Sequence, residues 1–178
     1  FRAVFNELNR LGEWKGENPL KNMRPFRTEE LEMAWLTHDQ ISQLLGECKR
    51  HGNPDLEAVV RICLATGARW SEAESLKKNQ LAKYKITYTN TKGRKNRTVP
   101  ISKEIYESLP DDKKGRLFSD CYGAFRSALE RTGIELPAGQ LTHVLRHTFA
   151  SHFMMNGGNI LVLQRILGHT DIKMTMRY

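Results

Sequence analysis

The sequence predicts a mainly helical α+β domain with one small antiparallel β-hairpin. Most of the chain shows apolar residues at helical spacing between capping residues and glycines, which is typical of amphipathic helices. One stretch alternates polar and apolar residues and is followed by a similar stretch, which is typical of a hairpin. The length of 178 residues fits one domain preceded by a fragment of another.

The first 14 residues predict the last helix of a preceding domain. Apolar residues recur at helical spacing from Val4 to Leu11, and the pattern ends at Gly12. Residues 15–34 are polar and contain prolines, so we expect a linker there. The chain opens without an initiator methionine, and we expect it to be a fragment of a longer protein.

Residues 35–178 are expected to form the main domain. Thr37-x-x-Gln40 is a capping box in front of an apolar run and predicts the first helix. A second helix is predicted with Pro54 at its first position and a stop at Gly67.

The next helix is predicted to be capped by Ser71-x-x-Glu74. Arg69 would therefore lie in a tight corner between two helices, on short and rigid backbone.

Lys85–Thr89 alternates as a strand, and 98–101 can return beside it. The intervening residues 90–97 become a hairpin tip. Four cationic residues lie on this tip: Lys92, Arg94, Lys95 and Arg97.

Five further helices follow. They are predicted at 102–109, at 119–132, from Thr142 to about Asn156, from the Asn159 cap to Gly168, and in a short stretch after Thr170.

The charge balance indicates a polyanionic partner. Lys+Arg number 28 against 20 Asp+Glu, a net charge of +8, and such an excess attracts nucleic acid. No apolar run exceeds four residues, whereas a membrane-spanning helix needs about 20, so no membrane association is expected. The three cysteines are widely spaced, which argues against a disulfide framework and fits a reducing cytosol.

The helix from Thr142 is expected to present cations on one face. His143, Arg146 and His147 share that face at 3.6 residues per turn. H-x-x-x-H is also a zinc spacing, but Val144 stands where the zinc proteases have glutamate, so no metal is expected.

Three separated motifs carry a resemblance to a known family. They are A-T-G-A-R-W-S-E at 65–72, H-V-L-R-H-T-F-A at 143–150, and L-G-H at 167–169 followed by Tyr178. In order, spacing and residue type they resemble the tyrosine recombinases, most of all temperate-phage integrases. The likeness covers 36–178, which implies a tyrosine recombinase/type IB topoisomerase-like catalytic domain that lacks its C-terminal tail, preceded by the end of a truncated core-binding domain.

The resemblance implies roles for individual residues. Arg69 and Arg146 correspond to the family's two arginines, His143 and His169 to its histidine pair, and Tyr178 to its nucleophile. Lys92 corresponds to the hairpin lysine, with Lys95 as an alternative that one sequence does not decide. Glu72 is expected to brace Arg69 or the histidine side, while Arg94, Lys95 and Arg97 hold the DNA.

These residue types suit phosphodiester chemistry. Arginines match phosphate geometry and stay charged, and charge builds on the non-bridging oxygens in the transition state. His143 is the candidate base for Tyr178, His169 is expected to donate to the phosphate, and Lys92 is placed to protonate the leaving 5′-oxygen. A phosphotyrosine conserves the energy of the broken bond, so no cofactor or metal is expected.

The leading hypothesis is a site-specific recombinase that cuts and rejoins duplex DNA through a 3′-phosphotyrosine. It would integrate and excise phage DNA at attachment sites in the cytoplasm of a bacterial host. A tetramer on DNA in the full-length parent and accessory DNA-bending proteins are the implied partners. Two alternatives stay open: a type IB topoisomerase-like enzyme and a catalytically idle DNA-binding module.

Overall fold

The computed structural model describes residues 1–24, 33–89, 96–111 and 113–178. Its contacts divide the chain into two units, Phe1–Leu31 and Glu32–Tyr178. The limits predicted for the truncated domain, the linker and the catalytic domain stay predictions.

The first unit contains α1 (Arg2–Arg10), which agrees with the helix predicted there. Phe5 on this helix packs edge-to-face against Trp14, with 5.3 Å between the ring centroids. The Asn18 amide donates hydrogen bonds to the Arg2 carbonyl and the Asn6 side chain at 2.9 and 2.6 Å. These contacts fold the chain back onto its first helix.

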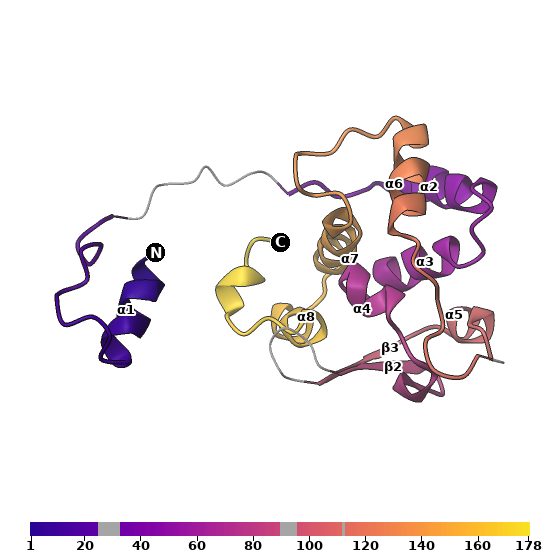
Figure 1. Cartoon of the computed structure of the whole chain (residues 1–178). Coiled ribbons are helices and arrows are strands. Elements are labelled where there is room, and N and C mark those ends of the chain that lie inside the picture. Colours follow the sequence, from indigo (N-terminus) through magenta and orange to yellow (C-terminus); the bar gives the residue numbers. More distant parts are fainter. Residues whose placement is uncertain (25–32, 90–95, 112) are drawn as a thin grey trace. The chain divides into compact units, whose positions relative to one another are not determined.

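The second unit consists of packed helices with a three-stranded antiparallel sheet at one edge, in the order β1-β2-β3 (Figure 1). Its α-helices are α2 (His38–Arg50), α3 (Leu56–Thr66), α4 (Trp70–Glu74), α5 (Lys103–Ser108), α6 (Tyr122–Thr132), α7 (His143–Met155) and α8 (Ile160–Leu167). Its strands are β1 (Leu81–Ala82), β2 (Lys85–Tyr88) and β3 (Arg97–Pro100), and its 3-10 turns are η1 (Lys78–Gln80) and η2 (Ile172–Met174). The predicted fold class is confirmed.

Helix α3 lies at the centre of the core. Its buried side chains are Leu56, Val59, Val60, Ile62, Cys63 and Thr66. Figure 1 shows α3 between the α2–α6 pair and the sheet, and it also packs against α7 and α4. An apolar helix covered on several sides fixes where its C-terminus lies, and that end borders the candidate site.

Two predicted helix starts are wrong. Helix α3 begins at Leu56, not at Pro54, because the Asn53 side chain accepts a hydrogen bond from the Asp55 amide (3.0 Å) and holds a turn there. Helix α6 begins at Tyr122, not at Ser119, whose amide and hydroxyl donate to the Asp55 carboxylate instead.

The predicted Ser71-x-x-Glu74 cap is also wrong. Helix α4 begins at Trp70, and the Arg69 amide donates to the Glu72 carboxylate at 2.9 Å. The Glu74 carboxylate accepts instead from the Trp70 indole and the Cys121 amide, both at 3.0 Å. The helix start thus falls two residues earlier than the motif suggested.

The other helix and strand predictions are confirmed, while residues 90–95 of the predicted hairpin tip lie outside the described residues. The Thr37–Gln40 capping box is present at the start of α2. Strands β2 and β3 pair with Ile86 opposite Val99, while the two-residue strand β1 was too short for an alternation pattern. No helix within the described ranges is long and apolar enough to cross a membrane.

Candidate active site

Residues from four parts of the second unit line a small cavity of about 210 Å³. The lining residues are Met33, Arg69, His143, Arg146, His147, His169, Met174, Arg177 and Tyr178. This lining, taken from the described part of the chain, contains three arginines and three histidines but no aspartate or glutamate side chain. A cavity of this charge selects an anionic group.

Arg146 is seated between the ends of two helices. One Nη donates at 2.7 Å to the carbonyl of Gly67, just after α3, and the other donates at 2.7 Å to the carbonyl of Leu167, the last residue of α8. The last carbonyls of a helix lack intrahelical partners and carry its negative dipole end, so both attract a cation. Burial and neighbouring cations lower the Arg146 pKa to about 10, which leaves the guanidinium charged at neutral pH.

Two glycines allow Arg146 to reach these two carbonyls, which together form what we call its backbone seat. Gly67 and Gly168 end their helices in left-handed conformations, with φ of +63° and +69°. A Cβ on Gly67 would lie 2.5 Å from Phe149 and 2.8 Å from Leu167. Gly67 is therefore required both for its backbone angle and for close packing against α7 and α8.

Arg69 is held by a carboxylate instead. Its Nη1 donates to Glu72 at 3.0 Å, and the same carboxylate accepts two hydrogen bonds from Arg97, at 3.0 and 2.5 Å. The two guanidinium groups and the Arg69 amide outweigh the burial of Glu72 and lower its pKa to about 2. Glu72 is thus ionised under ordinary conditions and joins the α3–α4 corner to β3.

Arg97 does not lie on the hairpin tip where the sequence analysis placed it. It is the first residue of β3, it is 7% exposed, and its guanidinium lies 4.6 Å from the Tyr88 ring centroid. A contact of Arg97 with DNA stays a prediction. Lys92, Arg94 and Lys95 lie outside the described residues.

His169 accepts rather than donates at its Nε2. An Arg146 Nη approaches this nitrogen at 3.0 Å, and because a guanidinium only donates, Nε2 must carry a lone pair. The ring hydrogen then resides on Nδ1 and is donated to the Thr175 hydroxyl at 2.9 Å. Burial and nearby arginines lower the His169 pKa to about 4, so the ring is neutral at pH 7. Its predicted donation to a phosphate stays a prediction and requires Nε2 to gain a proton.

Tyr178 is paired with a histidine. Its Oη lies 2.8 Å from Nδ1 of His147, and the two ring centroids are 5.7 Å apart. Burial raises the Tyr178 pKa, partly offset by Arg146 and Arg177, so the phenol is protonated. Burial, His143 and two arginines lower the His147 pKa to about 4, so that ring is neutral.

His143 completes the lining one turn before His147, with 6.2 Å between the ring centroids. Burial first, and then Arg146 and Arg69, lower its pKa. The structure therefore brings together five residues that the resemblance singled out: Arg69, His143, Arg146, His169 and Tyr178. Their chemical roles stay predictions.

Several residues at or beside this site have no role predicted from the sequence. His147 was placed on the correct helix face, and its position four residues after His143 was the available signal. Thr175, Arg177 and Met33 carried no signal, because their positions depend on how η2 and the segment before α2 pack.

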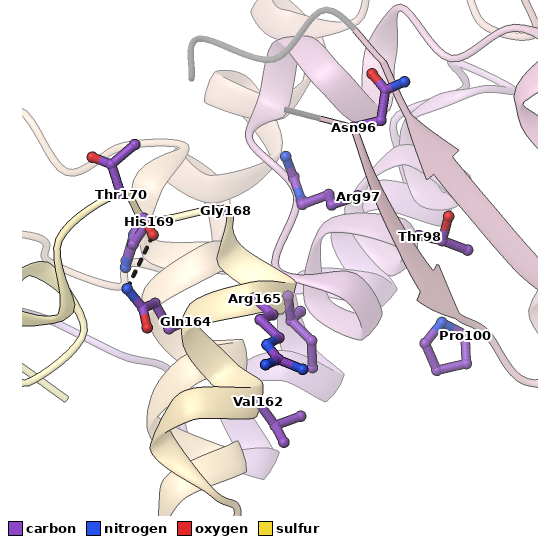
Figure 2. Close-up of a pocket in the computed structure, with 11 residues that line it drawn as sticks. Asn96, Arg97, Thr98, Pro100, Val162, Gln164, Arg165, Gly168, His169 and Thr170 are labelled. Atoms are coloured by element: carbon purple, nitrogen blue, oxygen red, sulfur yellow. Dashed lines mark hydrogen bonds between the residues drawn. The ribbon is translucent and has the colours of Figure 1, made fainter. Parts of the chain in front are cut away.

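A second hollow, of about 690 Å³, lies beside the site between β3 and α8. Figure 2 shows Thr98 and Pro100 from β3 on one side and Val162 and Arg165 from α8 on the other. His169 lies on its rim, where its carbonyl accepts a hydrogen bond from the Gln164 amide at 3.3 Å.

The described residues contain no group of three or more His, Cys, Asp or Glu side chains that could hold a metal ion. The three cysteines are buried as free thiols.

Two families match this chain. The phage integrase family matches residues 34–117 and 111–178, and the phage integrase N-terminal domain matches residues 1–27. The integrase of Escherichia phage 186 is 94% identical over 178 residues, which are 100% of this chain and 53% of that protein. The integrase of Haemophilus phage HP1 is 64% identical over 177 residues, which are 99% of this chain and 52% of that protein. The chain thus spans about half the length of these relatives.

Solved structures share the fold. The catalytic domain of bacteriophage HP1 integrase has a TM-score of 0.80 and 66% identity, covering 83% of this chain and 87% of that one. The XerA recombinase has a TM-score of 0.68 and 25% identity, covering 99% of this chain and 68% of that one. Fold and site together define a tyrosine recombinase catalytic domain. The chain belongs to the phage integrase family.

Proposed function

We propose that the chain is the catalytic part of a site-specific recombinase that cuts and rejoins duplex DNA through a 3′-phosphotyrosine. The observation that carries the proposal is the cavity in which Tyr178 meets Arg69 and Arg146, with no acidic side chain among the described residues that line it. Such a lining suits a phosphodiester beside a tyrosine hydroxyl.

The chemistry follows from the two arginines and the tyrosine. Arg69 and Arg146 bind the non-bridging oxygens, where negative charge accumulates as Tyr178 Oη attacks phosphorus. The P–O5′ bond breaks, and the predicted acid Lys92 protonates the leaving oxygen. Attack by a 5′-hydroxyl of another strand reverses these steps and rejoins the DNA without a cofactor.

The partners in this proposal are duplex DNA at phage attachment sites, further copies of the protein in a tetramer, and accessory DNA-bending proteins. The proposed location is the cytoplasm of a bacterial host. Two proteins that share the fold support DNA as partner: the Tn1549 transposon integrase, in complex with circular intermediate DNA, and XerH, bound to its difH substrate. The net charge of +8 agrees with such a partner.

A nicked suicide duplex that carries the attachment-site core of Escherichia phage 186 tests the proposal. The chain, and the same chain extended to the length of its relatives, should form a covalent adduct that Tyr178→Phe abolishes. Tyr122→Phe is the matched control, since Tyr122 is 47% exposed on α6 and should keep the adduct. An adduct that survives in Tyr178→Phe, or none from wild type, overturns the proposal.

Plasmid assays separate the open alternatives. A recombinase joins two attachment sites, whereas a topoisomerase-like enzyme relaxes supercoils on plasmids without such a site. A DNA-binding module binds duplex with a steep salt dependence and does neither.

A further inference from the structure

We propose that His147 accepts the proton of Tyr178 as the tyrosine attacks DNA, a role that the sequence analysis gave to His143. The inference deepens the proposed function and rests on it. It starts from the 2.8 Å contact between His147 Nδ1 and Tyr178 Oη.

The contact has the geometry that a general base requires. A base must lie within about 2.6–3.2 Å of the atom whose proton it removes, and His147 meets this condition before any substrate binds. His143 lies a helical turn away, with its ring centroid 6.2 Å from that of His147. His147 thus holds the position next to the nucleophilic oxygen.

The protonation states of Tyr178 and His147 agree with proton transfer from the tyrosine to the histidine. Tyr178 has a raised pKa and therefore keeps its hydrogen, which it can donate to a lone pair on Nδ1. His147 is neutral and carries one ring hydrogen, and accepting from Tyr178 at Nδ1 places that hydrogen on Nε2. The free site is thus poised with the proton on Tyr178 and an acceptor beside it.

Both partners are held in place. His147 lies inside α7, so its backbone is fixed by the helix. The Tyr178 amide donates to the Thr175 carbonyl at 3.1 Å, and the Tyr178 side chain packs against a cluster formed by Ala150, Leu163 and Leu167. Because both side chains start from ordered backbone, the contact costs little further ordering on substrate binding.

Bound phosphate would strengthen His147 as a base. The charged and titratable groups that act on His147 are His143 and Arg146 from its own helix, His169 after α8, and Arg177 beside Tyr178. The cations among them lower its pKa. A phosphate anion between the arginines offsets their charge, so the imidazolium formed by proton transfer is stabilised when substrate is present.

The step balances without a co-reactant. As the Oη–P bond forms, the phenol oxygen loses electron density and the Oη–H bond breaks, while Nδ1–H forms on His147. The P–O5′ bond breaks, and the leaving oxygen takes its proton from the acid of the proposed mechanism. Rejoining reverses each change, so His147 then returns the proton to Tyr178.

Single-turnover cleavage of the nicked suicide duplex tests this role. His147→Asn places an amide oxygen near the Nδ1 position, where it can accept a hydrogen bond but no proton. We expect adduct formation to slow about 100-fold or more while non-covalent DNA binding is retained. His152→Gln is the matched control on the same helix, because it keeps a donor toward the Leu36 carbonyl and should cleave at the wild-type rate.

The pH profile distinguishes a base from a merely structural residue. Cleavage by His147→Asn should rise about tenfold per pH unit above neutrality, because hydroxide must replace the lost base, while wild type levels off. Imidazole added to His147→Ala should restore part of the rate, which also covers the case in which the asparagine variant folds poorly. Parallel pH profiles together with no rescue by imidazole overturn the proposal.

A substrate with sulfur at the 5′-bridging position separates the base from the acid. A thiolate leaves without protonation, so this substrate rescues loss of an acid but not of a base. The His147→Asn defect should therefore persist on it, and rescue would place His147 at the leaving group instead. If wild type forms no adduct at all, the proposed function fails; if wild type and His147→Asn cleave equally, only this inference fails.

Discussion

Arg69 and Arg146 lie in one cavity but are held by different means. Arg146 is 4% exposed and donates to two backbone carbonyls at helix ends. The Arg69 side chain is 27% exposed and donates to the Glu72 carboxylate, which Arg97 shares. The backbone seat of Arg146 consists of main-chain carbonyls and depends on the backbone conformation. The carboxylate seat of Arg69 consists of the Glu72 side chain and depends on Glu72 being ionised.

Removing the carboxylate should have the largest effect. Glu72→Ala leaves Arg97, a buried cation, without its partner and frees Arg69, so we expect the free energy of unfolding to fall by about 3–5 kcal/mol. Urea unfolding measures this, and Glu130→Ala in an exposed pair on α6 is the control that should change little. Equal effects of the two substitutions would contradict a structural role for Glu72.

The backbone seat is broken by a single methyl group. Gly67→Ala combines a strained left-handed angle with contact against Phe149, and we expect a loss of about 2–4 kcal/mol together with reduced adduct formation. Gly133→Ala has the same helix-end conformation but no atom within 4 Å of the added Cβ, so it should cost about 1–2 kcal/mol and leave cleavage intact. Similar losses at both positions would mean that packing at Gly67 adds nothing.

Acid should weaken the carboxylate seat selectively. The Glu72 pKa falls from 4.5 to about 2 on folding, so its stabilisation is fully present above about pH 4.5 and is lost as pH falls through 2. Between pH 5 and pH 2.5, wild type should lose about 2 kcal/mol more stability than Glu72→Gln. Urea unfolding at the two pH values measures the difference, and parallel losses would show that Glu72 does not titrate in this window.

The smallest effect is expected from Thr175, which hydrogen-bonds His169, the third partner of Arg146. Thr175→Val keeps the shape of the residue but removes the acceptor for His169 Nδ1, which should cost about 1–2 kcal/mol. Thr98→Val, at an exposed strand position, is the control. Thermal unfolding compares them, and histidine NMR reports whether the His169 tautomer changes. Because Arg146 still donates to Nε2 in the variant, the hydrogen should stay on Nδ1, and a hydrogen found on Nε2 would argue against the assignment made from Arg146.

Local signals predicted the elements well where one residue alone decides the outcome. Gly67 and Gly168 each end a helix as expected, and Thr37 begins one. Two of the three wrong helix starts involve a carboxylate with a more distant partner. Glu74 accepts from Cys121, and Asp55 accepts from Ser119, contacts that no local pattern contains.

The site shows the same division. The order of the three motifs placed Arg69, Arg146 and Tyr178 in one site, because the spacing and residue types of such motifs can be read directly from the sequence. His147 and Tyr178 are 31 positions apart, and their contact depends on how η2 folds back. The sequence therefore did not predict this pair, and the structure was needed to find it. The burial of Arg97 was likewise hidden, because a strand's first residue and a hairpin tip look alike in sequence.

The backbone seat of Arg146 also sets a condition on folding. Its carbonyl partners lie 79 residues before it and 21 residues after it, so the guanidinium is in place once the end of α3 and the end of α8 have both docked on α7. A chain that has formed only its N-terminal helices lacks the Leu167 carbonyl and so has an incomplete set of partners for Arg146. Because the proposed cutting of DNA needs both arginines in place, we expect this activity to require α8 docked on α7.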